Sequence, residues 1–520
     1  MTASAEKTGD GIVSGPALDE LGSFTAGSRI DDLLAAAAES VPDQVALRTP
    51  GAAITYRELD RRVTAFAAAL RELGAGQGET VALAVGLDFA FAVAYFGIAR
   101  AGAVSAIANP FLPDDRLARS LGRSGAGTAV VTPRVYRRLA GSPAVRRFVL
   151  THRDGELDTE GAGLSTMDEL VSVGFRPRPV TAGEVAALQF TSGTTGPPKT
   201  VRLTHRNLIV NAAQTAYGNR LSGTSVLFNF LPTFHPMHLT IGVAARATHV
   251  LFPGQDLADA VRFAAETGAT HFYSLPVRLS RLAADPRLPG LEVPTLQAIL
   301  CGGSALPPAA AATLSAHFGV LTLQGYGLAE TSPSVSLGAP DRPKPGSSGV
   351  LVPGTECRIV HVGTGEVLDP GEKGEIQVRG PQVMKGYLDD HDVAPGDWFA
   401  TGDVGRFDED GHLFVVDRIK DVFKCDNWLV APTEIERVLG SHPAVVDCVV
   451  FDRPDEVHGA VACGIAVLAE AVEPDELLRF VNDRVAEYER LHVLWPVPEI
   501  PRSPTGKVPR RALRDRFLAY

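Results

Sequence analysis

The sequence predicts an α/β protein. We expect a large N-terminal region with several subdomains, parallel sheets and a β-rich subdomain, followed by a small mobile α+β C-terminal domain. Three observations carry this prediction. At 520 residues the chain exceeds what one hydrophobic core usually organises. Short β-branched runs alternate with Ala- and Leu-rich helical stretches through most of the chain. Glycine and proline turns later separate short strand-like runs.

Individual segments carry the same prediction. The β-branched runs at residues 81–85 and 127–131 are typical of buried strands, whereas residues 58–73 have the Ala- and Leu-rich composition of a helix. The runs at residues 375–379 and 412–416 are short strands between Gly/Pro turns, which indicates the β-rich subdomain.

Composition also predicts where the chain divides. Residues 1–27 are rich in Gly, Ser, Ala and acidic residues without periodicity, so we expect a mobile leader. Asp417 and Arg418 follow a strand and precede a charged turn. We therefore expect a large domain over residues 28–416 and a C-terminal lid over residues 417–520.

Charge and cysteine content restrict the classes of function. The net charge of −11, from 49 basic and 60 acidic residues, gives no positive field for nucleic acid, which is therefore not an expected partner. The most apolar stretch, residues 89–99, is far shorter than the ~20 residues of a membrane span, so it predicts a buried helix. The five cysteines lack metal-ligand or disulfide spacing, and the N-terminus lacks an export signal, which together favour a cytoplasmic location.

The segment from Thr191 to Lys199 reads Thr-Ser-Gly-Thr-Thr-Gly-Pro-Pro-Lys and follows an apolar run. Glycines let backbone N–H groups turn toward an anion, hydroxyl groups add donors, and the lysine adds charge, so the segment suits phosphates. Its spacing differs from that of a Walker loop, which disfavours a P-loop ATPase. The alternative interpretation is an ordinary surface turn.

This segment resembles the phosphate loop of the adenylate-forming superfamily, which comprises acyl-CoA synthetases, aryl-CoA ligases, peptide-synthetase adenylation domains and luciferases. The resemblance extends over about residues 30–515 because further motifs follow in the family's order. They are Gly302-Gly303-Ser304-Ala305, Gly325-Tyr326-Gly327-Leu328-Ala329-Glu330, Trp398-Phe399-Ala400-Thr401-Gly402-Asp403, Asp417-Arg418-Ile419-Lys420-Asp421 and Pro504-Thr505-Gly506-Lys507. The resemblance implies that ATP converts a carboxylic acid to an acyl-adenylate.

The resemblance also implies the nucleotide site. Glu330 would hold Mg²⁺ beside the triphosphate, although a glutamate at a helix start is the plainer alternative. Asp403 and Arg418 would contact the ribose, with a surface salt bridge as the alternative. The remaining residues expected at the nucleotide are Thr191, Ser192, Gly193, Thr194, Thr195, Gly196, Lys199, Gly303, Ser304, Ala305, Gly325, Tyr326, Gly327 and Lys507.

Two residues are the expected catalytic groups. Lys507 matches the family's catalytic lysine, whose ammonium would face developing charge, although alone it would be read as a solvated tail charge. His235 matches the position that borders the acid's carboxyl group, with a structural histidine as the alternative. Gly303 and Tyr273 are further expected contacts of the acid. The segment around His235 has no aspartate to pair with an α-ammonium, which favours an acid without an α-amino group.

The sequence departs from the family pattern at three motifs, and the departures at Asn427 and Ala460 fall on elements of the second step. Ala329 replaces a hydroxyl residue, Asn427 replaces a glycine in the acceptor-side loop with Lys424 and Trp428, and Ala460 replaces a glutamate. Asp417 is the expected hinge.

The sequence therefore leaves three functions open. The first is an AMP-forming ligase that joins an aryl or medium acyl acid to CoA or a carrier-protein thiol. The second is an amide synthetase with an amine acceptor, as in bacterial secondary metabolism. The third is a degenerate nucleotide-binding module. ATP and Mg²⁺ are the expected cofactors, with CoA as the candidate thiol.

Overall fold

The computed structural model describes residues 6–7, 11–24, 29–142, 145–154, 164–167, 169–170, 184–191, 199–231, 235–426, 428–502 and 508–518. The chain divides into two compact units. Apart from the first five residues, unit 1 comprises Ser14–Glu356 and Arg379–Phe399, and unit 2 comprises Glu6–Val13, Cys357–Val378 and Ala400–Tyr520. Parallel sheets, a β-rich region and a C-terminal α+β part are all present, so the predicted fold class is confirmed.

Unit 1 contains an eight-stranded sheet whose order is β21-β11-β10-β6-β5-β7-β8-β9. From β10 to β9 every neighbouring pair is parallel, whereas β11 and β21 add an antiparallel edge. The strands predicted at residues 81–85 and 127–131 are confirmed as β5 and β7. The bounds are β5 Thr80–Ala84, β6 Val104–Ile107, β7 Thr128–Val131, β8 Arg147–Leu150, β9 Ser165–Thr166, β10 Val185–Phe190, β11 Thr200–Thr204 and β21 Gly386–Tyr387.

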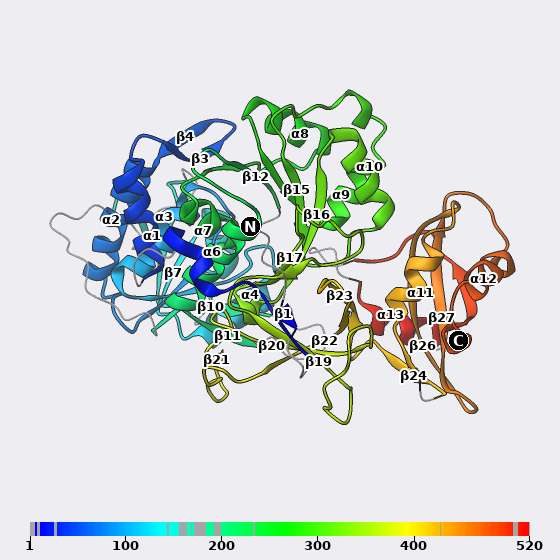
Figure 1. The fold of residues 1–520 in the computed structure, drawn as a ribbon. Coiled ribbons are helices and arrows are strands. Elements are labelled where there is room, and N and C mark those ends of the chain that lie inside the picture. Colours follow the sequence, from blue (N-terminus) through cyan, green and yellow to red (C-terminus); the bar gives the residue numbers. More distant parts are fainter. Residues whose placement is uncertain are drawn as a thin grey trace. The chain divides into compact units, whose positions relative to one another are not determined.

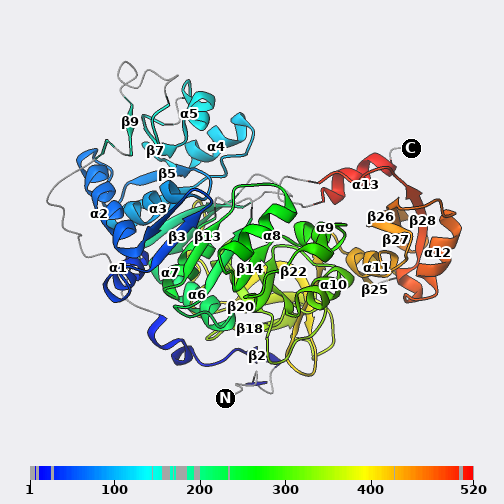
Figure 2. The same ribbon diagram turned by 90° about the horizontal axis from the view of Figure 1, so that it is seen from above.

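Helices cover both faces of this sheet because its strands are buried on both sides. Val81 and Leu83 face the core with α1–α3, and Ala82 and Ala84 face the core with α4 and α5. Figure 2 shows the helices α4 and α5 on the other side of β5 and β7 from α3. Every residue from 91 to 101 is buried, so the predicted buried helix is confirmed as α3. The bounds are α1 Ile30–Ser40, α2 Tyr56–Glu72, α3 Phe89–Ala101, α4 Asp114–Ser124 and α5 Pro133–Leu139.

A nine-stranded sheet, also in unit 1, has the order β18-β17-β16-β15-β14-β12-β13-β3-β4. Its central strands, from β16 to β3, are parallel, so their carboxyl ends meet at one edge of the sheet. Binding sites in open parallel sheets lie at such edges. The bounds are β3 Val45–Thr49, β4 Ala52–Thr55, β12 Val226–Phe230, β13 Thr248–Leu251, β14 His271–Ser274, β15 Ala298–Gly302, β16 Leu321–Gly327, β17 Ser334–Leu337 and β18 Val350–Leu351.

The faces of the nine-stranded sheet pack against different helices. Phe228 and Phe272 point toward α8, α9 and α10, and Leu227 and Leu300 point toward α6 and α7. Figure 1 shows α8, α9 and α10 gathered around β15 and β16. The bounds are α6 His205–Gly218, α7 Met237–Ala244, α8 Leu257–Glu266, α9 Pro276–Ala283 and α10 Pro308–Phe318, with short 3₁₀ helices η1 Leu18–Phe24, η2 Leu288–Gly290 and η3 Ala329–Thr331.

Unit 2 begins with a six-stranded sheet in the order β1-β2-β19-β20-β22-β23. The strands predicted at residues 375–379 and 412–416 are confirmed as β20 and β23. Alternate residues of β20 are buried, as expected for a sheet with one face toward a core. The bounds are β1 Glu6–Lys7, β2 Ile12–Ser14, β19 Glu356–Val360, β20 Gly374–Arg379, β22 Phe399–Phe407 and β23 Leu413–Arg418.

The C-terminal part of unit 2 is a three-stranded sheet with a helix layer on each face. Val450 and Val461 pack with α11 and α12, while Phe451 and Cys463 pack with α13. A short hairpin, β24–β25, precedes α11. The bounds are β24 Phe423–Cys425, β25 Trp428–Val430, α11 Pro432–Leu439, β26 Val445–Asp455, β27 Gly459–Leu468, α12 Pro474–Asn482, η4 Glu487–Glu489, β28 Leu491–Pro496 and α13 Arg510–Leu518.

All five cysteines are free thiols, and four of them are buried. Among the residues that the structure describes, no helix combines the length and the apolarity that crossing a membrane would require.

A buried histidine at the start of α6 joins two elements of unit 1. His205 accepts the backbone N–H of Ile30 at its Nδ1 atom, over 3.1 Å, and so fastens the start of α1. Only an unprotonated Nδ1 can accept this bond. Burial lowers the pKa of His205 to about 4, below its ordinary value of 6.5. Folding therefore favours the neutral imidazole.

This arrangement predicts that the protein loses stability in mild acid. Because the pKa of His205 is lower in the folded chain than in the unfolded chain, its contribution is complete above pH 6.5 and is lost as the pH falls toward 4. Between pH 7 and pH 5 we expect the titration of His205 to lower the free energy of unfolding by about 1–2 kcal/mol. Chemical denaturation of His205→Asn, which keeps an acceptor but cannot titrate, should show a shallower loss. His361→Asn, at an exposed turn, is the control, and equal pH slopes for all three proteins would contradict the assignment.

Candidate active site

The ends of the predicted phosphate loop form the base of a β-hairpin. Thr191 donates its backbone N–H to the carbonyl of Lys199 at 2.9 Å, and Lys199 N–H donates to the Thr191 hydroxyl at 3.0 Å. These two bonds close the β10–β11 connection. The remaining predicted loop residues lie outside the described part of the chain: Ser192, Gly193, Thr194, Thr195 and Gly196.

Lys199 and Glu330 are linked through one tyrosine. The Lys199 ammonium lies 4.3 Å from the centre of the Tyr387 ring, and the Tyr387 hydroxyl donates to Glu330 Oε1 at 2.9 Å. Burial, together with the neighbouring Glu330 carboxylate, raises the pKa of Tyr387 well above its usual range, so the phenol stays protonated and donates. A cation, a fixed hydroxyl and a carboxylate therefore lie together in unit 1.

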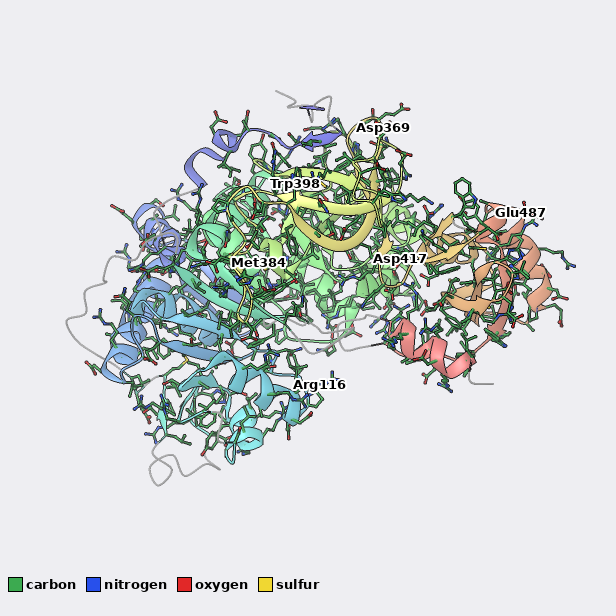
Figure 3. The ribbon with its side chains drawn as sticks, turned by 90° about the horizontal axis from the view of Figure 1, so that it is seen from below. Arg116, Asp369, Met384, Trp398, Asp417 and Glu487 are labelled. Carbon is green, nitrogen blue, oxygen red and sulfur yellow. The ribbon has the colours of Figure 1, made fainter. Side chains whose placement is uncertain are left out.

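The backbone around Glu330 is fixed as well. Its carbonyl accepts the backbone N–H of Met384, labelled in Figure 3, at 2.8 Å. Thr331 accepts the backbone N–H of Leu328 at 3.1 Å, which closes the short helix η3. The segment that carries Tyr387 thus also holds the main chain of Glu330.

Gly303, Ser304 and Ala305 follow the carboxyl end of β15. Gly303 has φ +90°, and the space where a Cβ atom would point is open to 4 Å, so the residue needs glycine for its backbone and not for packing. Ser304 and Ala305 are exposed. The segment is tied to β16 because Gln324 accepts the backbone N–H of Leu306 at 2.7 Å. The exposed atoms of residues 303–305 are therefore accessible at the carboxyl edge of the nine-stranded sheet.

The glycines of the Gly325-Tyr326-Gly327 motif have a structural cause in the described chain. A Cβ atom on Gly327 would lie 2.0 Å from the carbonyl oxygen of Pro333, and one on Gly325 would lie 2.9 Å from Leu337. Both contacts come from β17 or the turn before it, so the glycines are required for strand pairing. Tyr326, between them, pairs with Ser336 and is half-buried.

His235 joins the two sheets of unit 1. Its Nε2 lies 3.1 Å from Gln189 Oε1 on β10, and its Nδ1 accepts the backbone N–H of Met237 at 3.3 Å. This pattern requires a proton on Nε2 and none on Nδ1. Burial lowers the pKa of His235 to about 4, so the ring is neutral near pH 7. The predicted acid-contacting histidine therefore offers no positive charge.

Tyr273 is buried near the carboxyl end of β14. Its hydroxyl accepts from Asn219 Nδ2 at 3.0 Å, and its ring meets the His238 ring edge to face, with centroids 4.6 Å apart. Burial raises the pKa of Tyr273 above its usual range, so it is a neutral phenol. The side chain contacts α7, which begins two residues after His235.

In unit 2, β22 and β23 bring Asp403 and Arg418 together. The two residues are direct partners in the strand pairing, and Arg418 Nε lies 2.9 Å from Asp403 Oδ1. The Asp403 side chain is only 4% exposed, whereas the Arg418 side chain is 46% exposed. Gly402, which precedes Asp403 within β22, has φ +71°.

Asp417 fastens β23 to two helices of unit 2. It accepts the backbone N–H and the hydroxyl of Thr433, at 2.9 and 2.7 Å, and its other oxygen lies 3.2 Å from Arg510. Figure 3 labels Asp417 in this unit. The hinge role given to this residue stays a prediction.

The acceptor-side residues lie on the β24–β25 hairpin of unit 2. Lys424 is exposed, and the Trp428 side chain, 61% exposed, stacks on Tyr488 with ring centres 5.3 Å apart. Asp426 adopts φ +49° at the turn. Asn427 and the predicted catalytic Lys507 lie outside the described residues.

Sequence reasoning missed two residues of unit 1. Tyr387 follows a glycine in Lys385-Gly386-Tyr387, and only its place before an acidic run distinguishes it from other tyrosines. Gln189 lies two residues before Thr191, inside an apolar strand, where a buried polar residue is a signal for a partner. The structure supplies that partner as His235.

Comparison with known families gives two matches. The model described as AMP-binding enzyme matches residues 34–388, and the model described as AMP-binding enzyme C-terminal domain matches residues 434–507.

Known proteins resemble the chain over nearly its whole length. The 4-coumarate–CoA ligase 3 of Oryza sativa subsp. japonica is 31% identical over 492 residues, which cover 90% of this chain and 88% of the relative. The o-succinylbenzoate coenzyme A synthetase of Bacillus subtilis, solved with ATP and magnesium ion, has TM-score 0.79 and 26% identity and covers 93% and 99% of the two chains. The amide bond synthetase McbA of Marinactinospora thermotolerans has TM-score 0.83 and 24% identity, with coverage of 94% and 100%, and shows the fold alone.

With Glu330 as the magnesium ligand that the sequence predicts, its contact with Tyr387 predicts a magnesium effect. Tyr387→Phe keeps the ring beneath Lys199 but removes the hydroxyl that holds the carboxylate. Loss of a group that orients a metal ligand typically costs at least about tenfold in metal affinity. In thermal-shift titrations with ATP, the variant should need about ten times more magnesium for half-maximal stabilisation. Tyr217→Phe, which removes a hydroxyl 3.4 Å from the surface residue Glu20, is the control. An unchanged magnesium requirement in Tyr387→Phe would refute this role.

Proposed function

Because the chain belongs to the AMP-binding enzyme family, we propose that it is an AMP-forming acid ligase. It activates a carboxylic acid with ATP to an acyl-adenylate, releases pyrophosphate and transfers the acyl group to an acceptor. The acid is an aryl or medium acyl acid without an α-amino group, and the acceptor is a thiol of CoA or of a carrier protein. The similarity to plant 4-coumarate–CoA ligases over 90% of the chain supports this proposal.

The observation that carries the proposal is the link from Lys199 through Tyr387 to Glu330. A triphosphate needs a cation for its oxygens and an oxygen ligand for the metal ion that accompanies it. Lys199 and Glu330 supply these two groups within one unit, at the ends of strands where phosphate-binding loops are usual.

The residues present fit a magnesium ion. Mg²⁺ takes oxygen ligands and is usually held by one or two carboxylates together with the substrate's phosphates, and Glu330 offers such a carboxylate with one oxygen already oriented. When bound, the ion supplies charge neutralisation to the phosphate oxygens. Tyr387 keeps the Glu330 carboxylate in place before the substrate arrives.

The reaction of the proposal needs little covalent chemistry from the protein. A carboxylate oxygen of the acid forms a bond to the α-phosphorus, and the bond to the bridging oxygen breaks, so pyrophosphate leaves with the electron pair. Positioning and charge stabilisation dominate such transfers. Lys199 contacts phosphate oxygens, and Lys507 is assigned to the attacking carboxylate and the bridging oxygen.

His235 borders the acid in this proposal. It remains neutral, because burial lowers its pKa to about 4, and its Nε2–H is directed to Gln189. It therefore shapes the site for the acid's carboxyl group without neutralising the carboxylate, which keeps its charge for attack. Asp403, held by Arg418, is assigned to the ribose hydroxyls, and Tyr326 to the adenine.

An amine acceptor is the second candidate. The acceptor-side hairpin carries a large exposed ring, Trp428, held against Tyr488, and the same loop has Asn427 in place of a family glycine. The fold is shared with an amide bond synthetase from Marinactinospora thermotolerans. Both acceptors require the same first step, so the acceptor alone separates the two functions.

One assay tests both steps. The purified protein is incubated with ATP, magnesium and a panel of aryl and aliphatic acids, with CoA or with a pool of amines, while pyrophosphate is followed and products are resolved by mass. We expect acid-dependent pyrophosphate release and an acyl-CoA. Amides formed without CoA would replace the thiol ligase with the amide synthetase, and absence of pyrophosphate with every acid would reject the adenylation itself.

Substitution of the acceptor-side hairpin should separate the steps. Trp428→Ala removes the exposed ring and should change acyl transfer by about tenfold or more while initial pyrophosphate formation stays within about twofold, because an interaction made only in one step affects only that step. Phe111→Ala, which removes a ring that is 59% exposed in unit 1, serves as the control. Equal losses in both steps for Trp428→Ala would show that Trp428 stabilises the fold and has no specific role in acyl transfer.

A further inference from the structure

A cluster of buried polar side chains lies on one face of the nine-stranded sheet. Asn229 on β12, His249 on β13 and His238 on α7 belong to it, together with Tyr273 on β14, and we call these four residues the sheet-face cluster. Asn229 and Tyr273 are direct partners in the strand pairing. Asn229 Nδ2 lies 3.3 Å from His249 Nε2, and the His238 ring packs on the Tyr273 ring.

Three atoms of this cluster have no hydrogen-bond partner in the described part of the chain. They are Asn229 Oδ1, His238 Nδ1 and His249 Nδ1. Asn229 is 2%, His238 7% and His249 1% exposed, so solvent does not reach them as it reaches surface groups. A buried polar atom without a partner destabilises the folded state, and such atoms in native proteins call for a water or a ligand. Here three of them gather on adjacent elements.

The hydrogen-bonding capacity of the cluster does not depend on how the amide or ring is assigned. If Asn229 donates to His249 Nε2, the His249 Nδ1–H and the Asn229 carbonyl oxygen are free. If the amide is reversed and accepts from Nε2–H, the His249 Nδ1 lone pair and an amide N–H are free. In both arrangements the pair offers at least one donor and one acceptor, which is what a hydroxyl or an amino group can satisfy.

The cluster is uncharged and has apolar surroundings. Burial lowers the pKa of His249 to about 3 and that of His238 well below its ordinary value, so both rings are neutral near pH 7. Leu227, Ile241 and Leu300 belong to the hydrophobic core on the same face as Tyr273. Such a site would suit a neutral polar group on an apolar body. A second carboxylate would be buried there without a cation, which is costly.

The cluster is also placed beside the residue that the proposed function assigns to the acid. His238 lies three residues after His235, and the backbone N–H of Met237, which precedes His238 on α7, donates to His235 Nδ1 at 3.3 Å. We propose that the acid activated by this chain carries a neutral hydroxyl or amino group, which hydrogen-bonds to Asn229, His238 or His249 while its carboxyl group lies at His235. This inference rests on the proposed adenylation and narrows its substrate class.

The first test uses the unmodified protein and matched acids. Aryl and aliphatic acids are compared in pairs that differ only in a hydroxyl or amino group against a methyl group of similar size, at each position of the ring or chain. A site with buried polar groups rejects an analogue that leaves them unpaired, so for at least one position kcat/KM should favour the polar acid by about tenfold or more. Equal or greater kcat/KM for every methyl acid would overturn the inference and leave those atoms to bound water.

Two variants connect the preference to the cluster. Asn229→Leu removes the amide with little change of volume, and His238→Phe keeps an aromatic ring against Tyr273. At least one of them should reduce the ratio of kcat/KM for polar and methyl acids to within about twofold of unity. The control is His317→Phe, which removes an imidazole on α10 that contacts the Leu291 carbonyl at 2.8 Å, and it should leave the ratio unchanged.

The ratio is measured within one preparation, so it does not depend on the fraction of protein that is folded. If a variant does not fold, the pairs measured on the unmodified protein still decide the question. A preference that survives in both variants would overturn the inference, because the polar group would then bind elsewhere. Failure of the proposed function has a different signature, since no acid of either kind would release pyrophosphate.

Discussion

The Tyr387 hydroxyl is the contact on which the proposed phosphate site of unit 1 depends. Lys199 and Glu330 lie 131 residues apart in the sequence. Without a residue that contacts both, their side chains would be free to move relative to each other. Tyr387 lies beneath the ammonium and donates to the carboxylate, and it is itself fixed by the pairing of β21 with β11. Because its pKa is raised, the phenol does not become a second anion beside Glu330.

The remaining geometry of unit 1 follows from two parallel sheets whose carboxyl ends carry polar residues. The eight-stranded sheet supplies Gln189 and Thr191 at the end of β10, and the nine-stranded sheet supplies His235 after β12 and Gly303 after β15. The hydrogen bond that His235 donates to Gln189 holds the two edges together. In the proposed function, this junction is where the acid's carboxyl group and the phosphates of the nucleotide would lie next to each other.

Much of the fold could be predicted from sequence because local patterns decide it. The apolar run of α3 and the β-branched run of β5 have the periods and lengths of their elements, and the structure has them there. The motif residues Asp403 and Arg418 could be named, and strand pairing brings them to 2.9 Å.

The other parts of the site could not be predicted in this way. Tyr387 acts through a residue distant in sequence, and no pattern links it to Glu330. A Cβ atom at position 327 would meet the carbonyl oxygen of Pro333, and this requirement for glycine can be found only from coordinates. The sheet-face cluster joins Asn229 and His249 across two strands, and only the register of the sheet shows which polar residues of the strands share a buried face.

The fate of a carboxylate oxygen tests the central claim most directly. The acid is labelled with ¹⁸O in its carboxyl group and incubated with ATP, magnesium and acceptor until product forms, and the nucleotide and phosphate products are analysed by mass. Attack of the carboxylate on the α-phosphorus predicts one ¹⁸O atom in AMP and none in pyrophosphate. Label in orthophosphate, together with ADP, would show an acyl-phosphate route and would contradict the account.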